Sequence, residues 1–201
     1  MKQLYHGSRT GNLSKLAPSI SMHGKLYVYA TKYKMIALAY LGRFDSMEIS
    51  QISHKSDNRL TGVSMAERHK NAFINAYDGK TGYLYIVDDE NFKSDQTEWS
   101  LEVVSEDEVD VIDCIKIDNA LDELKRLSET GDGQLRLYYY PDRPDYMPSD
   151  DRDMIDAALE SYEISKNIET AKRYFQFYPQ LKEKIVQKFL DVYSIDLNDG
   201  Q

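Results

Sequence analysis

Two stretches near the N-terminus decide the fold that the sequence predicts: residues 4–16 read LYHGSRTGNLSKL, and residues 26–41 read LYVYATKYKMIALAYL. In the first stretch, a β-rich run at 1–6 leads into a turn rich in glycine and polar residues. In the second, the run up to Thr31 is typical of a strand, and the Ala/Leu-rich run at 34–41 predicts a short helix with Thr31 as its candidate N-cap. The chain therefore opens with a strand, a loop, a second strand and a helix.

The rest of the chain predicts an α+β protein whose helices gather toward the C-terminus. Further strands are expected at 47–52, 82–87, 99–104, 109–117 and 134–140. Further helices are expected at 64–77, 119–129, 149–166, 168–177 and 180–193. The last helix carries an apolar face at helical spacing, formed by Ile185, Phe189, Leu190 and Tyr193.

We expect three parts: a core at 1–117, a helix and strand packed on that core at 118–146, and a C-terminal helical segment at 147–201. Two arrangements of the helical segment fit the sequence. It is either a cap packed on the sheet or a bundle or helix pair that binds a partner.

Composition and charge limit the class of protein. The chain has 201 residues, of which 41% are hydrophobic, which is enough to form a core. Its net charge is −9, which disfavours a general nucleic-acid binder. The charge is uneven, because residues 1–60 hold nine Lys/Arg against three Asp/Glu. This basic segment predicts that an anion is bound near the N-terminus, although scattered solubilising charge would give the same pattern.

The single cysteine, Cys114, lies in an apolar run, where a buried free thiol is expected. One cysteine excludes an internal disulfide and any zinc site built from several cysteines. The sequence shows no apolar leader and no run of about 18 apolar residues. We therefore expect a cytoplasmic protein with no membrane partner.

The order and spacing of three residues resemble the ADP-ribosyltransferase superfamily in its His-Tyr-Glu branch, which includes poly-ADP-ribose polymerases and diphtheria toxin. That family opens with an apolar pair followed by His-Gly-Ser/Thr, as His6 does here within LYHGS. A strand with a tyrosine follows, matched by Tyr29 in VYAT, and a helix ends in a second tyrosine eleven residues later, matched by Tyr40. The resemblance covers residues 2–117 and implies a split β-sandwich with short helices.

The family also has a glutamate in a late strand, followed by a turn and another strand, and two residues are candidates for it. Glu98 follows a polar stretch, whereas Glu102 stands among apolar residues before the acidic turn at 105–108. In one regular strand the two would share a face and lie about 13 Å apart, so only one could reach a common ribose. The surroundings of Glu102 match the family pattern better, and Glu98 is the alternative carboxylate.

The resemblance implies NAD as the substrate, with no metal, and the sequence carries no metal-binding motif. Glu102 would stabilise the cationic ribose that forms when nicotinamide leaves. His6 would bind the adenosine-side ribose, the Gly7 backbone would hold the nicotinamide amide, and Tyr29 and Tyr40 would sandwich its ring. The same resemblance assigns NAD binding to the neighbouring Ser8 and Arg9. The basic residues available for the pyrophosphate are Arg9, Lys15, Lys25 and Lys32.

One departure from the family pattern bears on function. Poly-ADP-ribose polymerases carry a serine three residues before the second tyrosine, and here that position is Ala37. Features for chain elongation are also absent from the sequence, so we expect mono-ADP-ribosyl transfer to an unknown protein, nucleic-acid or small-molecule acceptor. The alternatives are a catalytically inactive fold of this family used as a binding module, and an unrelated α+β interaction protein.

Overall fold

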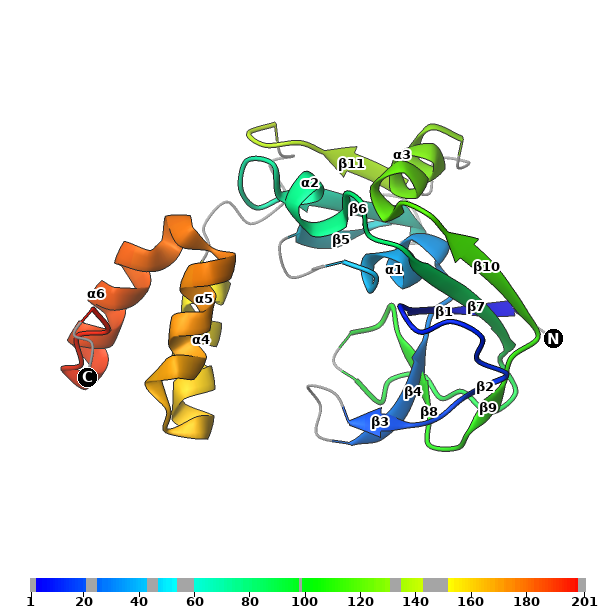
Figure 1. Ribbon diagram of the computed structural model, residues 1–201, viewed down its shortest axis with the longest axis horizontal. Helices are drawn as coiled ribbons and strands as arrows, with labels where there is room; N and C mark the ends of the chain where they lie inside the picture. Colours follow the sequence, from blue (N-terminus) through cyan, green and yellow to red (C-terminus); the bar gives the residue numbers. More distant parts are fainter. Residues whose placement is uncertain are drawn as a thin grey trace. The chain divides into compact units, whose positions relative to one another are not determined.

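The computed structural model describes residues 3–20, 25–42, 47–53, 60–97, 99–130, 135–142 and 152–198. The chain divides into two compact units, Met1–Arg143 and Pro144–Gln201. Helices are combined with several small sheets, so the expected α+β class is confirmed (Figure 1).

The described part of the first unit forms three small sheets and one two-stranded ladder. In the first sheet, β7 (Gly82–Asp88) pairs antiparallel with β1 (Gln3–Ser8) on one side and β10 (Asp113–Ile117) on the other. The second sheet has the order β3 (Ser19–Ile20), β4 (Leu26–Ala30), β8 (Val103–Ser105). The third has the order β11 (Leu135–Tyr138), β6 (Leu60–Glu67), β5 (Met47–Ser53). The two-stranded ladder joins β2 (Lys15–Leu16) to β9 (Val109–Asp110).

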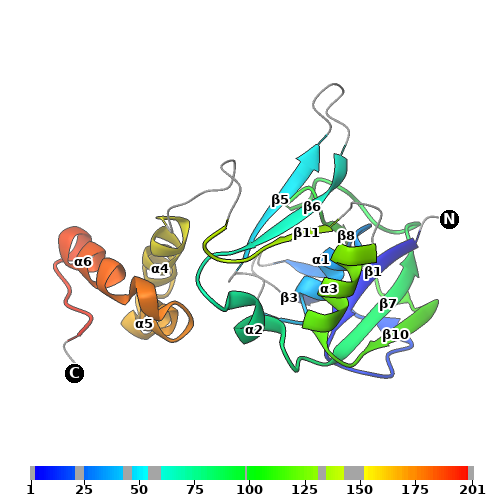
Figure 2. The same cartoon turned by 90° about the horizontal axis from the view of Figure 1, so that it is seen from above.

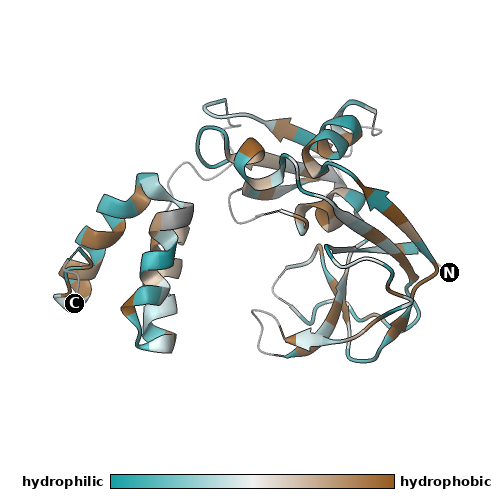
Figure 3. Ribbon diagram, in the orientation of Figure 1, coloured by the Kyte–Doolittle hydropathy of each residue, from teal (hydrophilic) through white to brown (hydrophobic). Residues whose placement is uncertain are grey.

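Helix α1 (Lys34–Ala39) lies at the centre of this unit, between the β5–β6 pair and the sheet of β1 and β7 (Figures 1 and 2). Every residue from Met35 to Ala39 is buried, and Figure 3 colours most of the helix as hydrophobic. Helices α2 (Ala72–Tyr77) and α3 (Ala120–Thr130) complete the same hydrophobic core. A second cluster, around Leu4, Val28 and Tyr85, joins β1, β4 and β7.

The second unit is helical and has its own core. It consists of α4 (Arg152–Ser165), α5 (Ile168–Phe177), a 3₁₀ turn η2 (Pro179–Leu181) and α6 (Lys182–Tyr193). The fully buried members of this core are Ala158, Ala171, Tyr178, Leu181, Ile185 and Phe189. Asn167 caps α5, because its side-chain oxygen accepts a hydrogen bond from the Glu169 N–H at 3.0 Å. Among the described residues, no helix is both long and apolar enough to cross a membrane.

Several predicted elements are confirmed, but the helix expected at 64–77 is wrong in its first half. Ser64, Met65 and Ala66 belong to β6, which pairs with β5 on one edge and β11 on the other. These two partners override the helical propensity of the segment. The backbone of Asn71 is left-handed, with φ of 64°, so α2 begins only after it.

The strand expected at 99–104 is also largely wrong. Residues 99–102 form a turn in which the Glu102 N–H donates to the Trp99 carbonyl at 3.0 Å, and the strand begins only at Val103. The strand begins at Val103 because its partner strand β4 ends at Ala30, which is opposite Val103.

Three smaller expectations need correction. The run at 109–117 is two strands, because β9 pairs with β2 whereas β10 pairs with β7. Cys114 is exposed rather than buried, because β10 is an edge strand. The N-cap of α1 is Tyr33, and Thr31 instead accepts a hydrogen bond from the Tyr33 N–H through its hydroxyl at 3.2 Å.

Candidate functional site

The first and second sheets meet at a short backbone bridge between β1 and the residue after β4. The Tyr5 N–H donates to the Thr31 carbonyl at 2.8 Å, and the Thr31 N–H donates to the Tyr5 carbonyl at 3.0 Å. If this antiparallel ladder continued, the next hydrogen-bonded pair would be Gly7 and Tyr29. It does not continue, and the two sheets therefore separate beyond His6.

The His6 side chain takes the place of that missing ladder bond. Its Nδ1 donates to the Tyr29 carbonyl at 2.7 Å. Strand alternation points the N–H and C=O of Gly7 to the same side as those of Tyr5, away from β7. No hydrogen bond among the described residues uses these two groups of Gly7. One donor and one acceptor of the backbone are thus presented where the sheets part.

The hydrogen bond to Tyr29 also fixes the chemistry of His6. A carbonyl oxygen can only accept, so Nδ1 carries the proton. Burial lowers the pKa of His6, although the hydrogen bond to the Tyr29 carbonyl opposes this effect. The imidazole is therefore neutral at pH 7, and its Nε2 is an acceptor suited to a hydroxyl group.

Helix α1 approaches β1 at Gly7 so closely that only glycine fits. A Cβ atom at this position would lie 1.9 Å from the Ala37 carbonyl oxygen and 3.5 Å from Tyr40 Cβ. The Ala37 side chain is fully buried. Tyr40, the C-cap residue of α1, is thereby placed next to the free edge of β1.

Tyr40 connects this edge to Glu102, because its hydroxyl donates a hydrogen bond to Glu102 Oε1. Extending the β4–β8 register by one residue beyond Ala30 and Val103 sets Thr31 opposite Glu102. Contacts from four different elements therefore bring together His6, Gly7, Tyr40, Glu102 and the backbone carbonyl of Tyr29.

Glu102 is a buried carboxyl group, with 7% of the residue exposed. Removal from water penalises the charged form and raises the pKa of Glu102 to about 7. A carboxyl group that titrates near neutrality is a common feature of functional sites.

Trp99, to which the sequence pattern gives no role, borders this group. Its ring meets the Tyr40 ring edge-on, with the centroids 6.5 Å apart. It also closes the turn that presents Glu102, as the acceptor of the Glu102 N–H. A tryptophan three residues before the predicted carboxylate was the only signal in the sequence.

Other predicted NAD-binding residues make contacts within the fold. Ser8 Oγ accepts a hydrogen bond from the Thr10 N–H at 3.1 Å. The Arg9 guanidinium donates two bonds to the Leu41 carbonyl, at 2.9 and 2.7 Å. Lys15 forms ion pairs with Glu108 at 2.7 Å and with Asp110 at 3.6 Å.

Of the remaining basic residues, Lys25 lies over the Tyr27 ring, with its Nζ 5.9 Å from the centroid, and Lys32 is exposed. Glu98, the alternative carboxylate, lies outside the described residues.

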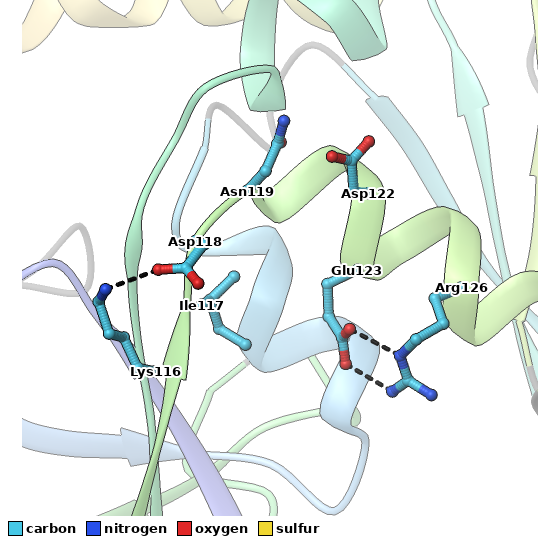
Figure 4. Close-up of a pocket in the computed structure, with 7 residues that line it drawn as sticks. All are labelled: Lys116, Ile117, Asp118, Asn119, Asp122, Glu123 and Arg126. Atoms are coloured by element: carbon cyan, nitrogen blue, oxygen red, sulfur yellow. Dashed lines mark hydrogen bonds and ion pairs between the residues drawn. The ribbon is translucent and has the colours of Figure 1, made fainter.

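A surface pocket of about 330 Å³ lies elsewhere, between the end of β10 and the first turns of α3 (Figure 4). Both of its basic side chains are paired with a carboxylate. Lys116 contacts Asp118 at 2.7 Å, and Arg126 holds Glu123 through two bonds of 2.7 and 2.6 Å. None of the predicted site residues lines it.

Comparisons of the chain with protein-family models, with curated proteins and with solved structures found no match. Within the described ranges, no group of three or more His, Cys, Asp or Glu side chains is placed to hold a metal ion.

Proposed function

We propose that the protein is a mono-ADP-ribosyltransferase of the His-Tyr-Glu type, built on that family's split β-sandwich. The observation that carries the proposal is the buried carboxyl group of Glu102, linked through Tyr40 to the edge where His6 and Gly7 are presented. This arrangement supports the proposal because His6, Tyr40 and Glu102 come from separate stretches of the sequence pattern.

The reaction breaks the bond between the ribose C1′ and the nicotinamide nitrogen of NAD. Nicotinamide leaves with the electron pair as a neutral molecule, and positive charge develops on the ribose. The ionised Glu102 stabilises that charge, and a nucleophilic acceptor then attacks C1′ and releases a proton. Burial strengthens the electrostatic effect, because little water screens the carboxylate.

The β1 edge supplies the groups that would orient NAD. The Gly7 N–H and C=O match the acceptor and donor of a carboxamide. The Nε2 of neutral His6 accepts a hydrogen bond from a ribose hydroxyl. Tyr29 and Tyr40 offer aromatic faces for the nicotinamide ring, and such contacts contribute about 0.5–1.5 kcal/mol per pair.

Ala37 makes one difference from the polymerases of this family. It offers no hydroxyl to the nicotinamide amide, so the Gly7 backbone bears more of the recognition. We therefore expect NAD to bind weakly and a single ADP-ribose to be transferred to a protein, a nucleic acid, a small molecule or water.

The proposal is tested by incubating the purified full chain with NAD and measuring nicotinamide release by chromatography. Release that saturates with NAD and rises with pH through about 7 is expected, because the carboxylate form of Glu102 is required. A flat rate between pH 5 and pH 9 would contradict the assigned role of Glu102.

Thermal unfolding in the presence of NAD supplies a second measurement. A ligand that binds only the native state stabilises it by RT ln(1 + [L]/Kd), about 2.7 kcal/mol at a hundredfold excess over Kd. NAD should raise the Tm, and divalent metals should not. If millimolar NAD gives neither nicotinamide release nor a higher Tm, the enzyme proposal is wrong. The protein is then better interpreted as a binding module that does not recognise NAD.

A further inference from the structure

Glu102 reaches the site from a turn rather than from a strand, so its position depends on what holds that turn. The turn begins at Trp99 and closes with the Glu102 N–H to Trp99 carbonyl bond. The buried side chain of Leu101 anchors it to the core. Gln51 of β5 donates to Ser100 Oγ at 2.5 Å.

Trp99 has a second connection to the carboxyl group, through Tyr40. The Trp99 and Tyr40 rings meet edge-on, and the Tyr40 hydroxyl donates to Glu102. Trp99, Tyr40 and Glu102 are thus joined pairwise by one backbone bond, one ring contact and one side-chain bond. A closed set of three contacts restricts all three side chains more than any single contact would.

We propose that Trp99 is a positioning residue that holds Tyr40 against Glu102 and keeps water away from the carboxyl group. The indole ring is the largest apolar group on this turn. An apolar side chain packed beside a carboxyl group removes solvent that would otherwise stabilise the anion. The raised pKa of Glu102 agrees with this arrangement.

The contacts of Trp99 can be tested without assuming any reaction, whereas its catalytic effect rests on the proposed function. Trp99 is the only tryptophan of the chain, so the intrinsic fluorescence excited at 295 nm reports on this residue. The titratable groups that contact it are Tyr40, through its ring, and Glu102, through its backbone N–H, and Glu98 is next to it in the sequence.

The first experiment records Trp99 emission between pH 5 and pH 9 in the wild type and in Glu102→Gln. We expect a sigmoidal change with its midpoint near 7 in the wild type and none in Glu102→Gln. Glu98→Gln is the matched control and should keep the transition. A wild-type emission that is flat over this range, or a transition that survives in Glu102→Gln, would overturn the proposal.

The second experiment compares Trp99→Ala with Trp99→Phe by carboxyl ¹³C NMR of the glutamates, with the Glu102 signal assigned by its absence from Glu102→Gln. Trp99→Ala should lower the pKa of Glu102 by at least about one unit, toward its ordinary value. Trp99→Phe, which retains a ring, should largely preserve the raised pKa. An unchanged pKa in a folded Trp99→Ala protein would show that the indole ring does not shield the carboxyl group.

Nicotinamide release separates this proposal from the proposed function. In an active enzyme, Trp99→Ala should lower kcat by about tenfold or more with a smaller change in KM, and should move the acid limb of the pH profile to lower pH. If the wild type releases no nicotinamide, the proposed function fails, while the fluorescence and NMR results still decide the role of Trp99. If Trp99→Ala does not fold, Trp99→Phe and the fluorescence titration decide it.

Discussion

Two polar regions of the first unit accommodate their ionisable side chains in opposite ways. In the pocket beside α3, each basic side chain faces a carboxylate in contact with solvent, as Lys116 faces Asp118. At the meeting of β1, α1 and β8, the polar side chains are largely buried and hydrogen-bonded to an uncharged hydroxyl or a carbonyl, as Glu102 and His6 are. In the pocket, an ion pair keeps both partners charged. In the other region, burial shifts the pKa of the side chain.

The direction of each pKa shift shows the difference. In the pocket, the hydrogen bond and charge of Arg126 lower the pKa of Glu123, which keeps the carboxylate ionised. In the other region, burial raises the pKa of Glu102 to about 7. A paired surface carboxylate stays ionised near pH 7 and contributes little to stability. A buried carboxyl group with a raised pKa can change its protonation near pH 7. The pocket beside α3 is therefore not the better candidate for chemistry.

The largest expected effect concerns the Glu102 carboxylate. Glu102→Gln keeps the shape of the side chain but removes its charge, so nicotinamide release should fall by about 10²–10³-fold with little change in NAD binding. Steady-state rates and a binding titration measure the two effects.

Two controls each remove a charge elsewhere. Glu98→Gln and Arg126→Gln should keep the rate within a few-fold of the wild type. A loss of activity in Glu98→Gln alone would exchange the roles of the two glutamates. Equal losses in Glu102→Gln and Glu98→Gln, without the same loss in the oppositely charged change Arg126→Gln, would point to a general effect of net charge.

The next effect tests the close packing of α1 on β1. Gly7→Ala would drive its Cβ into the backbone carbonyl of Ala37, which cannot move without shifting the helix. We expect the free energy of unfolding to fall by about 3 kcal/mol, measured by urea denaturation. Gly79→Asn is the control, because Gly79 has a φ of 65° and open space around it, and asparagine tolerates this conformation. Equal losses in the two variants would contradict the close approach.

A smaller effect links Glu102 to stability. Because its folded-state pKa is raised, the native state binds more protons than the unfolded state between about pH 4.5 and pH 7. The contribution of Glu102 to stability is therefore present at low pH and lost as pH rises through 7. Glu102→Gln should be more stable than the wild type by about 2–3 kcal/mol at pH 8, and nearly equal to it at pH 4.5. Unfolding curves at the two pH values measure this, and a variant that is less stable at pH 8 would exclude the burial of a charged group.

The smallest effect is expected in the pocket. Glu123→Gln and Arg126→Gln break an exposed ion pair, which in most proteins contributes little to stability. Thermal unfolding at low and high salt should show no measurable change in Tm for either variant. A clear loss that disappears at high salt would give this pair a structural role and weaken the contrast between the two regions.

Local sequence determined much of the first unit. The β-rich run ending at Ala30 forms β4, and the Ala/Leu-rich run after it forms α1, because valine and tyrosine favour strands whereas alanine and leucine favour helices. The same patterns gave the order of the late helices. The predicted helix at 64–77 failed because β5 and β11 supply partners on both edges of β6, and no local pattern contains that information.

For the candidate site too, some features were determined by the sequence and others only by the fold. The sequence by itself determined the residue types and their order. His6, Tyr29, Tyr40 and Glu102 were selected because their order and surroundings resemble the His-Tyr-Glu family, with Glu98 as the alternative carboxylate. Only the tertiary structure decided that β1 pairs with the end of β4 through the single bridge between Tyr5 and Thr31. It also decided that Glu102 lies on a turn and that the Trp99 ring contacts the Tyr40 ring. These features depend on strand partners and ring contacts between residues far apart in the chain. The pKa of a carboxyl group follows from them, because burial is a property of the packed fold and not of the sequence around it.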